Sequence, residues 1–328
     1  MKKKRIKISV VVPTYNSEKT IEKCVKSIIN STYTNFELII VDDFSFDNTR
    51  KIIQNIGVKV FNQKNMGAAA SRNIGASLAR GDLIVFIDSD VEINKDTFSN
   101  LIRLFSSNEN LASVSGLYCD NKYQNIISAY QNIYESFIQK TISKLNNPPY
   151  INTSFFAIKK SIFKEIGGFN TQFRLANQED IDFGKTLVSL GYKNIFSGKI
   201  KIKHLKEFSF PAFLKKKYYQ GNEFIKVYSK QKNNLKMNHL TLDHTRNNVI
   251  IALLLIFIGA FSFFEHKLLY LLLLLAISFY YFNSDFINYV KVKKTNRILV
   301  YNFFIILQSF FILFGLILGG FKYVVLRK

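Results

Sequence analysis

Leu83–Asp90, with the sequence LIVFIDSD, is the stretch that decides the fold. Its apolar residues match a β-strand buried on both faces, and the acidic residues that follow mark the end of the strand. Similar apolar runs precede it, separated by helical patterns, and this alternation predicts an α/β domain with a mostly parallel sheet and helices on both faces. The expected strands are Ile6–Val12 (ended by Pro13), Phe36–Val41, Val58–Phe61 and Leu83–Ile87, and the expected helices cover 17–31, with Ser17 as N-cap, 47–55 and 67–80.

Polar residues follow three of these strands. Pro13-Thr14-Tyr15-Asn16 come after the first strand, Asp42-Asp43 after the second, and Asp88-Ser89-Asp90 after the fourth. Ligands of parallel sheets bind beyond the carboxyl ends of the strands, which lie at one edge. The sequence therefore predicts the functional site at this edge.

Asp88 and Asp90 are candidate metal ligands. Two carboxylates in this spacing after a buried strand can approach one cation, and oxygen ligands favour Mg²⁺ or Mn²⁺ over zinc. A cation held in this way keeps positions open for substrate phosphates. The alternative is a turn that caps the next helix, and the tripeptide by itself leaves both interpretations open.

Four other positions could carry chemistry, and each has a structural alternative. Asp42-Asp43 could bind a ribose or a base, or could simply form a turn. Arg72 lies near the start of a predicted helix, where phosphates bind, although the position by itself favours an ordinary surface arginine. Glu179-Asp180 could supply a general base, but acidic residues favour any helix N-terminus. His204 could bind a metal or a diphosphate, or could be structural.

The C-terminal part of the 328-residue chain is different in character. It contains three uncharged runs, Val249–Phe264, Leu268–Phe282 and Ile298–Phe321. A membrane-spanning helix needs about 20 apolar residues, which the third run reaches and the first two reach only with flanking residues or a thinned bilayer. We expect two to three transmembrane helices. The alternative, a buried helical hairpin in a soluble core, would leave no polar face for water.

Charge indicates how such an anchor would be oriented. The net charge is +22, and segment 206–247 before the first run is basic and aromatic, so we expect an amphipathic segment on an anionic membrane surface. Nucleic-acid binding is not favoured beside an anchor. The positive-inside tendency and the lack of a secretory signal pattern predict a multi-pass protein of the plasma or inner membrane with a cytoplasmic large domain. Lys322, Arg327 and Lys328 would lie outside if all three runs cross, which leaves the number of spans open.

The three strand-end motifs, taken with four others, resemble family 2 glycosyltransferases. No single motif is specific, and the resemblance rests on their order and spacing over about residues 6–205. The motifs are Val11-Val12-Pro13-Thr14-Tyr15-Asn16, Ile40-Val41-Asp42-Asp43-Phe44-Ser45, Asn65-Met66-Gly67 with Ser71-Arg72-Asn73-Ile74-Gly75, Phe86-Ile87-Asp88-Ser89-Asp90, Ile166-Gly167-Gly168-Phe169, Glu179-Asp180 and Gly191-Tyr192.

The resemblance implies a GT-A fold and transfer of a sugar, with inversion, from a nucleotide-diphosphate donor, with a UDP-sugar as the expected donor. It also implies a divalent cation, Mg²⁺ or Mn²⁺. The implied donor-binding residues are Pro13, Tyr15, Asn16, Asp42 and Asp43 around the base, Arg72 near the phosphates and Asp88 at the ribose and sugar. The implied metal ligands are Asp90, Asp88 and His204, and the implied catalytic residues are Asp180 as general base and Glu179 in support.

These inferences define an expected organisation. Residues 1–205 form a cytoplasmic GT-A domain, with a nucleotide-sugar half at 1–95 and an acceptor half at 96–205, followed by the juxtamembrane segment 206–247 and the anchor 248–328. A lipid-linked or glycan acceptor is expected of this hexosyltransferase. A Q-x-x-R-W motif of processive synthases has its nearest match at 220–224, which lacks the Arg and the Trp. The alternatives are a non-catalytic membrane scaffold on a degenerate transferase fold and, less favoured, a nucleotidyltransferase.

Overall fold

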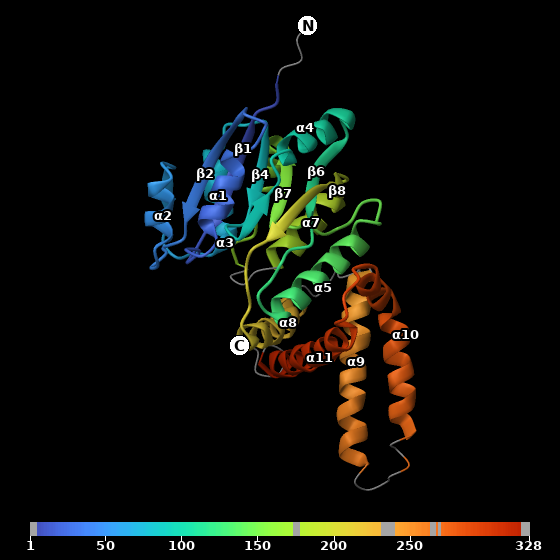
Figure 1. Ribbon diagram of the computed structural model, residues 1–328. Helices are drawn as coiled ribbons and strands as arrows, with labels where there is room; N and C mark the ends of the chain where they lie inside the picture. The colour runs from blue at the N-terminus through green and yellow to red at the C-terminus, as the bar shows by residue number, and fades with distance from the viewer. Residues whose placement is uncertain (1–4, 173–177, 231–239, 263–266, 268–269, 323–328) are drawn as a thin grey trace. The chain divides into compact units, whose positions relative to one another are not determined.

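The computed structural model in Figure 1 describes residues 5–172, 178–230, 240–262, 267 and 270–322. The chain divides into two compact units, which we name the sheet unit and the helical unit. The sheet unit comprises Met1–Lys122 and Ile142–Lys206, and the helical unit comprises Tyr123–Thr141 and Glu207–Lys328. Helix α5 (Ile126–Ile142) therefore groups with the C-terminal helices, although it lies in sequence between two strands of the sheet.

The sheet unit contains a mixed sheet of eight strands in the order β3-β2-β1-β4-β7-β6-β8-β5. Its first half is parallel, as the alternating sequence pattern predicts, because β1 pairs in parallel with β2 and β4, and β2 pairs in parallel with β3. The predicted α/β class is confirmed. The strands are β1 (Ile8–Thr14), β2 (Phe36–Asp42), β3 (Val60–Asn62), β4 (Leu83–Ile87), β5 (Val91–Ile93), β6 (Leu111–Tyr118), β7 (Phe155–Lys159) and β8 (Lys193–His204).

Helices cover both faces of the sheet because the side chains of a strand alternate between its faces. Val10 and Val12 of β1 pack with residues of α1 and α4 in one core, whereas Val11 packs with residues of α3, α6 and α7 in the other. The helices of this unit are α1 (Ile21–Ile29), α2 (Thr49–Asn55), α3 (Ala68–Leu78), α4 (Thr97–Ser107), α6 (Lys160–Ile166) and α7 (Gln178–Ser189).

Two local predictions are wrong. Pro13 does not end the first strand, which continues to Thr14 with Pro13 opposite Val41 of β2. The pairing of β1 with β4 stops at Val11, so the missing N–H of Pro13 breaks no ladder there. Ser17 is not the N-cap of α1, which begins at Ile21 after Thr20, and the Ser17 hydroxyl bonds to Ser89 instead.

The described parts of the three apolar runs form helices of the helical unit. All three of these helices, α9, α10 and α11, are long and apolar enough to cross a membrane among the residues described. Its core combines aromatic residues of α5 with residues of α8, α10 and α11. Besides α5, its helices are α8 (Phe210–Lys230), α9 (Leu240–Phe261), α10 (Tyr270–Val292) and α11 (Ile298–Gly320).

Candidate active site

Asp88 stands directly behind the buried strand β4 and is held by two side chains. Its Oδ1 accepts a hydrogen bond from Arg72 Nη2 at 2.7 Å, and its Oδ2 accepts one from Ser154 Oγ at 3.1 Å. Ser154 is close because β7 begins beside the end of β4, with Phe155 opposite Ile87. The antiparallel neighbour of β4 thus fixes Asp88, the first carboxylate of Asp88-Ser89-Asp90.

Arg72 joins this motif to the acidic pair at the start of α7. Its guanidinium, with a side chain 4% exposed, also donates from Nη1 to Glu179 Oε1 at 3.0 Å. Burial disfavours the charge of Arg72, but the carboxylates of Asp88 and Glu179 outweigh it and raise the Arg72 pKa. The three predicted residues therefore form one ion-pair network within the sheet unit, from segments far apart in sequence.

Asp180 is adjacent to this network and carries a free oxygen. Its Oδ2 accepts a hydrogen bond from Thr153 Oγ1 at 3.0 Å, whereas its buried Oδ1 has no hydrogen-bond partner among the residues described. Burial and the neighbouring charge of Glu179 raise the pKa of Asp180 to about 8, against the opposing effect of Arg72. A carboxylate with a pKa near neutrality and an unpaired oxygen is suited to general-base work.

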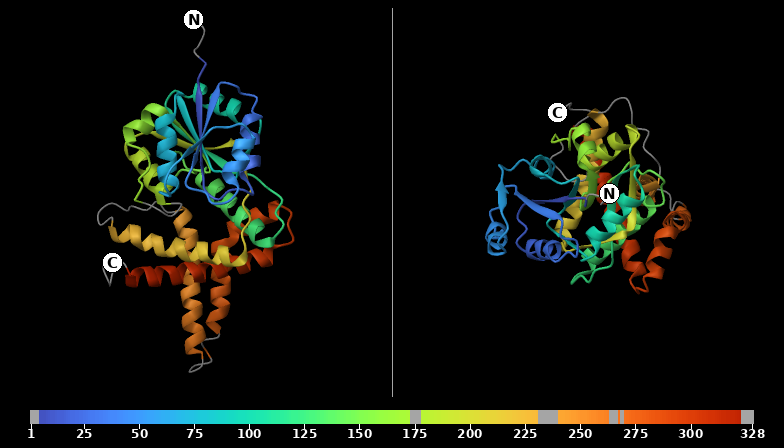
Figure 2. Two further views of the ribbon diagram at one scale, coloured as in Figure 1. Left: turned by 90° about the vertical axis from the view of Figure 1, so that its left-hand side faces the viewer. Right: turned by 90° about the horizontal axis from the view of Figure 1, so that it is seen from above.

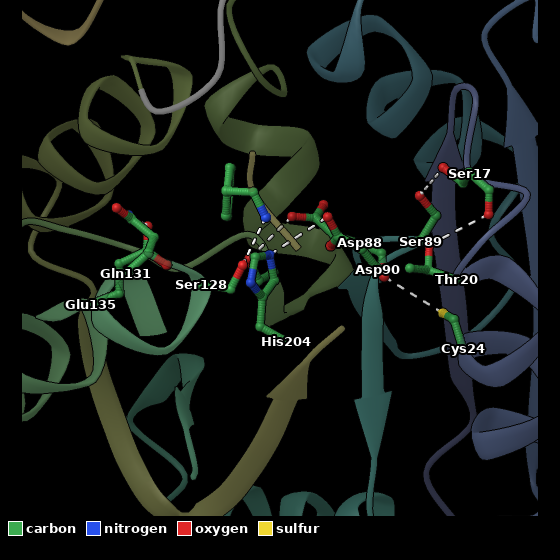
Figure 3. Close-up of polar contacts among 12 residues, drawn as sticks. Ser17, Thr20, Cys24, Asp88, Ser89, Asp90, Ser128, Gln131, Glu135 and His204 are labelled. Atoms are coloured by element: carbon green, nitrogen blue, oxygen red, sulfur yellow. Dashed lines mark hydrogen bonds and ion pairs between the residues drawn. The ribbon is translucent and has the colours of Figure 1, made fainter. Parts of the chain in front are cut away.

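Asp90 and His204 form a second contact at the same strand ends (Figure 3). Strand β5 pairs antiparallel with β8, Val91 lies opposite His204, and the histidine Nε2 approaches Asp90 Oδ2 to 3.5 Å. A carboxylate oxygen and an imidazole nitrogen both suit Mn²⁺, so the pair fits a divalent cation with open positions. Asp88 is engaged by Arg72, and no group of three His, Cys, Asp or Glu residues suited to a metal occurs within the described ranges.

The predicted wall around a base is built from the loops after β1 and β2. The Asn16 N–H donates to Ser45 Oγ at 2.9 Å, and Asn16 Oδ1 accepts from the Phe46 N–H at 3.0 Å, so the two loops are tied together. Pro13 is buried, but Tyr15 is 45% exposed and meets the 82% exposed Phe46 edge to face. Exposed rings at the end of a parallel sheet offer a stacking surface to a planar ligand.

Asp42 and Asp43, in contrast, are buried and occupied by protein donors. Asp42 accepts from Arg50 Nε at 2.6 Å and from Ser45. Asp43 accepts from the N–H groups of Met66 and Gly67, each at 2.8 Å, which fixes the loop leading to α3. A direct contact between these two carboxylates and a donor stays a prediction, as do the other residue roles implied by the resemblance.

Sequence reasoning missed several residues of this site. Thr153 and Ser154 precede β7 without any motif, and Phe46 carries no signal beyond its place three residues after Asp43. The sequence predicts Ser17 as a helix cap, yet its hydroxyl lies 2.7 Å from that of Ser89, the middle residue of Asp88-Ser89-Asp90 (Figure 3). Only the general rule that residues after parallel strands gather at one edge could have included Phe46 and Ser17.

The sequence is similar to a known family and to several glycosyltransferases. The family model described as "Glycosyl transferase family 2" matches residues 9–167. A glycosyltransferase GlyG of Streptococcus pneumoniae is 32% identical over 176 residues, which are 48% of this chain and 58% of the relative. A Campylobacter jejuni protein named GalNAc(5)-diNAcBac-PP-undecaprenol beta-1,3-glucosyltransferase is 30% identical over 51% of this chain and 56% of its own length. The matches thus span less than two thirds of these curated relatives.

A solved structure extends the likeness to the fold. The mannosyltransferase PcManGT of Pyrobaculum calidifontis, determined with GDP-Man and Mn²⁺, superposes with a TM-score of 0.59 over 98% of this chain and 88% of that chain. At 16% sequence identity this similarity concerns the fold alone. The resemblance inferred from the ordered motifs is confirmed: residues 9–167 match the model of glycosyl transferase family 2, and the fold is GT-A-like.

Proposed function

We propose that the chain is an inverting glycosyltransferase that moves a hexose from a nucleotide-diphosphate donor, a UDP-sugar, to a lipid-linked or glycan acceptor. The observation that carries this proposal is the Arg72 bridge between Asp88 and Glu179, with contacts of 2.7 and 3.0 Å. This bridge joins Asp88, the residue that we assign to the donor, to Glu179 at the N-terminus of α7. An inverting transferase needs acidic groups for the donor and for the acceptor close together, since the leaving group and the acceptor lie on opposite sides of the anomeric carbon.

The reaction is a single displacement. The free Oδ1 of Asp180 takes the proton of an acceptor hydroxyl, and that oxygen forms a bond to the anomeric carbon of the sugar. The bond from this carbon to the diphosphate oxygen breaks at the same time, and its electron pair leaves with the nucleoside diphosphate. Thr153 holds the other oxygen of Asp180, which keeps the base in one orientation.

Asp90 and His204 would hold the divalent cation, with Asp88 beside them. A cation bound there supplies positive charge opposite the departing diphosphate. Asp88, oriented by Arg72 and Ser154, would accept hydrogen bonds from sugar or ribose hydroxyls. Tyr15 and Phe46 would stack against the base. Arg72, which is buried and bonded to Asp88 and Glu179, would stand near the donor phosphates and orient Asp88.

The C-terminal helices support a location at a membrane. Residues 1–205 would act at the cytoplasmic face of the plasma or inner membrane, next to the juxtamembrane segment 206–247, with residues 248–328 as anchor. The three apolar helices support membrane attachment, and the relative whose name includes an undecaprenol-linked substrate supports a lipid-linked acceptor.

The test uses full-length protein in detergent, a panel of nucleotide sugars, Mn²⁺, and released nucleoside diphosphate as readout. One donor should stand out, and its turnover should vanish with chelator and return with Mn²⁺. Asp90→Asn and Asp180→Asn should each lower turnover by about 10²-fold or more, with an unchanged melting temperature for Asp90→Asn. Glu109→Gln, a matched loss of an exposed carboxylate, should leave turnover unchanged. Full turnover by Asp90→Asn under metal-free conditions would refute the assigned roles.

The alternative of a non-catalytic membrane scaffold makes a different prediction. Such a protein would bind a partner or a nucleotide but release no nucleoside diphosphate from any donor. The unpaired oxygen of Asp180 and the buried network of Arg72, Asp88 and Glu179 argue against this alternative. Burying charged groups lowers the stability of a fold, which a scaffold without catalytic function has no reason to accept.

A further inference from the structure

Helix α11 is the most apolar helix of the chain, yet it packs against the most basic one. A Cβ placed on Gly315 of α11 would lie 2.0 Å from the Tyr218 carbonyl oxygen of α8, and one placed on Gly221 of α8 would lie 2.1 Å from the Ile312 carbonyl oxygen. Only glycine permits such an approach of two backbones. Helix α8 carries Lys215-Lys216-Lys217 and therefore cannot follow α11 through the hydrocarbon of a bilayer.

The α8–α11 pair lies across the other two apolar helices. Helices α9 and α10 run side by side, joined by a reciprocal amide pair between Asn248 and Asn283 at 3.0 and 2.8 Å. Both Figure 1 and the left view of Figure 2 show this hairpin extending away from the pair, with α11 on the side toward which the hairpin projects and α8 on the other. Helix α11 thus runs across the direction in which the hairpin would cross a membrane.

The exposed surfaces of these helices are apolar. Beyond the Asn248–Asn283 pair the hairpin exposes large apolar residues of both helices, among them Phe257 and Leu273. Helix α11 buries one side, including Phe304 and Ile312, and exposes Leu299, Phe303, Phe314, Ile317 and Phe321 along its length. An apolar stripe of this length facing water would be unfavourable, so lipid is the occupant that its chemistry fits.

Helix dimensions agree with this arrangement. The uncharged runs of the hairpin contain 16 and 15 residues, Val249–Phe264 and Leu268–Phe282. At about 1.5 Å per residue they cover roughly 22–24 Å, less than the hydrocarbon core of about 30 Å. A helix lying flat beside the base of the hairpin adds a layer of about 10 Å. Hairpin and flat helix together match one bilayer core.

We propose that only α9 and α10 cross the membrane, and that α11 lies in the plane of the leaflet with its exposed stripe against the acyl chains of an anionic membrane. Helix α8 then lies at the headgroups, where Lys215 faces lipid phosphates. Lys322, which follows α11, then stays on the same side of the membrane as helix α8, which removes the conflict with the positive-inside tendency. The inference rests on the membrane attachment proposed above but not on the catalytic assignments.

The test maps sidedness with single cysteines in the full chain, in a Cys24→Ala, Cys119→Ser background. Intact cells making Lys206→Cys, Lys267→Cys or Lys322→Cys are treated with a membrane-impermeant maleimide before and after permeabilisation. We expect Lys322→Cys to behave like Lys206→Cys, labelled only after permeabilisation, and Lys267→Cys at the hairpin tip to be labelled in intact cells. Opposite behaviour of Lys322→Cys and Lys206→Cys would overturn the proposal.

A depth measurement distinguishes a flat helix from a spanning one independently. Spin labels at Leu299→Cys, Phe303→Cys, Phe314→Cys and Ile317→Cys, in vesicles that contain phosphatidylglycerol, report depth through relaxation by oxygen and by a water-soluble nickel complex. A flat α11 gives the same shallow depth at all four positions, whereas a spanning helix gives a depth that passes through a maximum. If Lys206→Cys and Lys322→Cys are both labelled in intact cells, the two-span arrangement stands and the proposed cytoplasmic location of the catalytic unit fails.

Discussion

Replacing Arg72 by alanine tests whether the acidic network depends on one buried cation. The variant leaves Asp88 and Glu179 without the guanidinium that now bonds them at 2.7 and 3.0 Å. Removing one partner of a buried ion pair costs about 3–5 kcal/mol, because the remaining charge stays buried without compensation. At about 2–4 °C per kcal/mol for a unit of this size, the melting temperature should fall by roughly 6–20 °C.

Two further variants separate charge from geometry. Arg72→Lys keeps the charge but cannot bond two carboxylates in a fork, so we expect a smaller loss of about 1.5–3 kcal/mol. Adding Glu179→Gln to Arg72→Ala removes one unpaired charge and should recover part of the lost stability, as a positive coupling in a double-mutant cycle.

The assay is thermal unfolding of the full-length protein in one detergent, followed by intrinsic fluorescence at a fixed scan rate. Lys26→Ala breaks the exposed ion pair of Lys26 with Glu22 and serves as the control, with an unchanged melting temperature. If Arg72→Ala melts with the wild type and the control, the network does not stabilise the fold, and the reasoning fails.

Three other predictions follow from the same structure. Because the pKa of Asp180 is about 8, kcat/KM should rise with pH up to that value, and Asp180→Asn should remove this rise from the pH–rate profile. The same raised pKa means that the folded protein binds a proton that the unfolded chain releases above its own carboxyl pKa of about 4. Stability should therefore decline as pH rises from about 4 to 8, and less so in Asp180→Asn, as melting temperatures across that range will show. Gly315→Ala should lower the melting temperature and weaken vesicle binding in flotation assays, because its Cβ has no space beside the Tyr218 carbonyl, whereas Gly320→Ala, which meets nothing within 4 Å, should change neither.

Local sequence patterns predict the parallel half of the sheet well. Short apolar runs such as Leu83–Ile87 specify strands because both faces are buried, and strand β4 has the predicted bounds. The helix N-terminus at Glu179-Asp180 is also where the acidic residues place it, at the start of α7. These features depend on neighbours within a few residues, which is the range over which periodicity and capping act.

Contacts between distant segments could not be predicted. Arg72 and Glu179 are 107 positions apart, and nothing in either motif indicates that one binds the other. For the same reason the sequence does not indicate that the Asp43 carboxylate accepts hydrogen bonds from the backbone before α3. Hydropathy likewise ranks α11 as the best span, because it measures composition and carries no information about the direction of a helix or its partner.

The placement of α5 has a practical consequence for attempts to produce the sheet unit as a water-soluble fragment. Its rings Tyr130, Tyr134 and Phe137 pack with Phe213, Phe286 and other residues that lie beyond position 206. Truncating the chain after β8 would expose these aromatic side chains to solvent. Helix α5, which lies in sequence between β6 and β7, would then present an apolar surface that favours aggregation. The protein is best purified whole, since helix α5, a part of the core of the helical unit, lies in sequence well before the C-terminal helices.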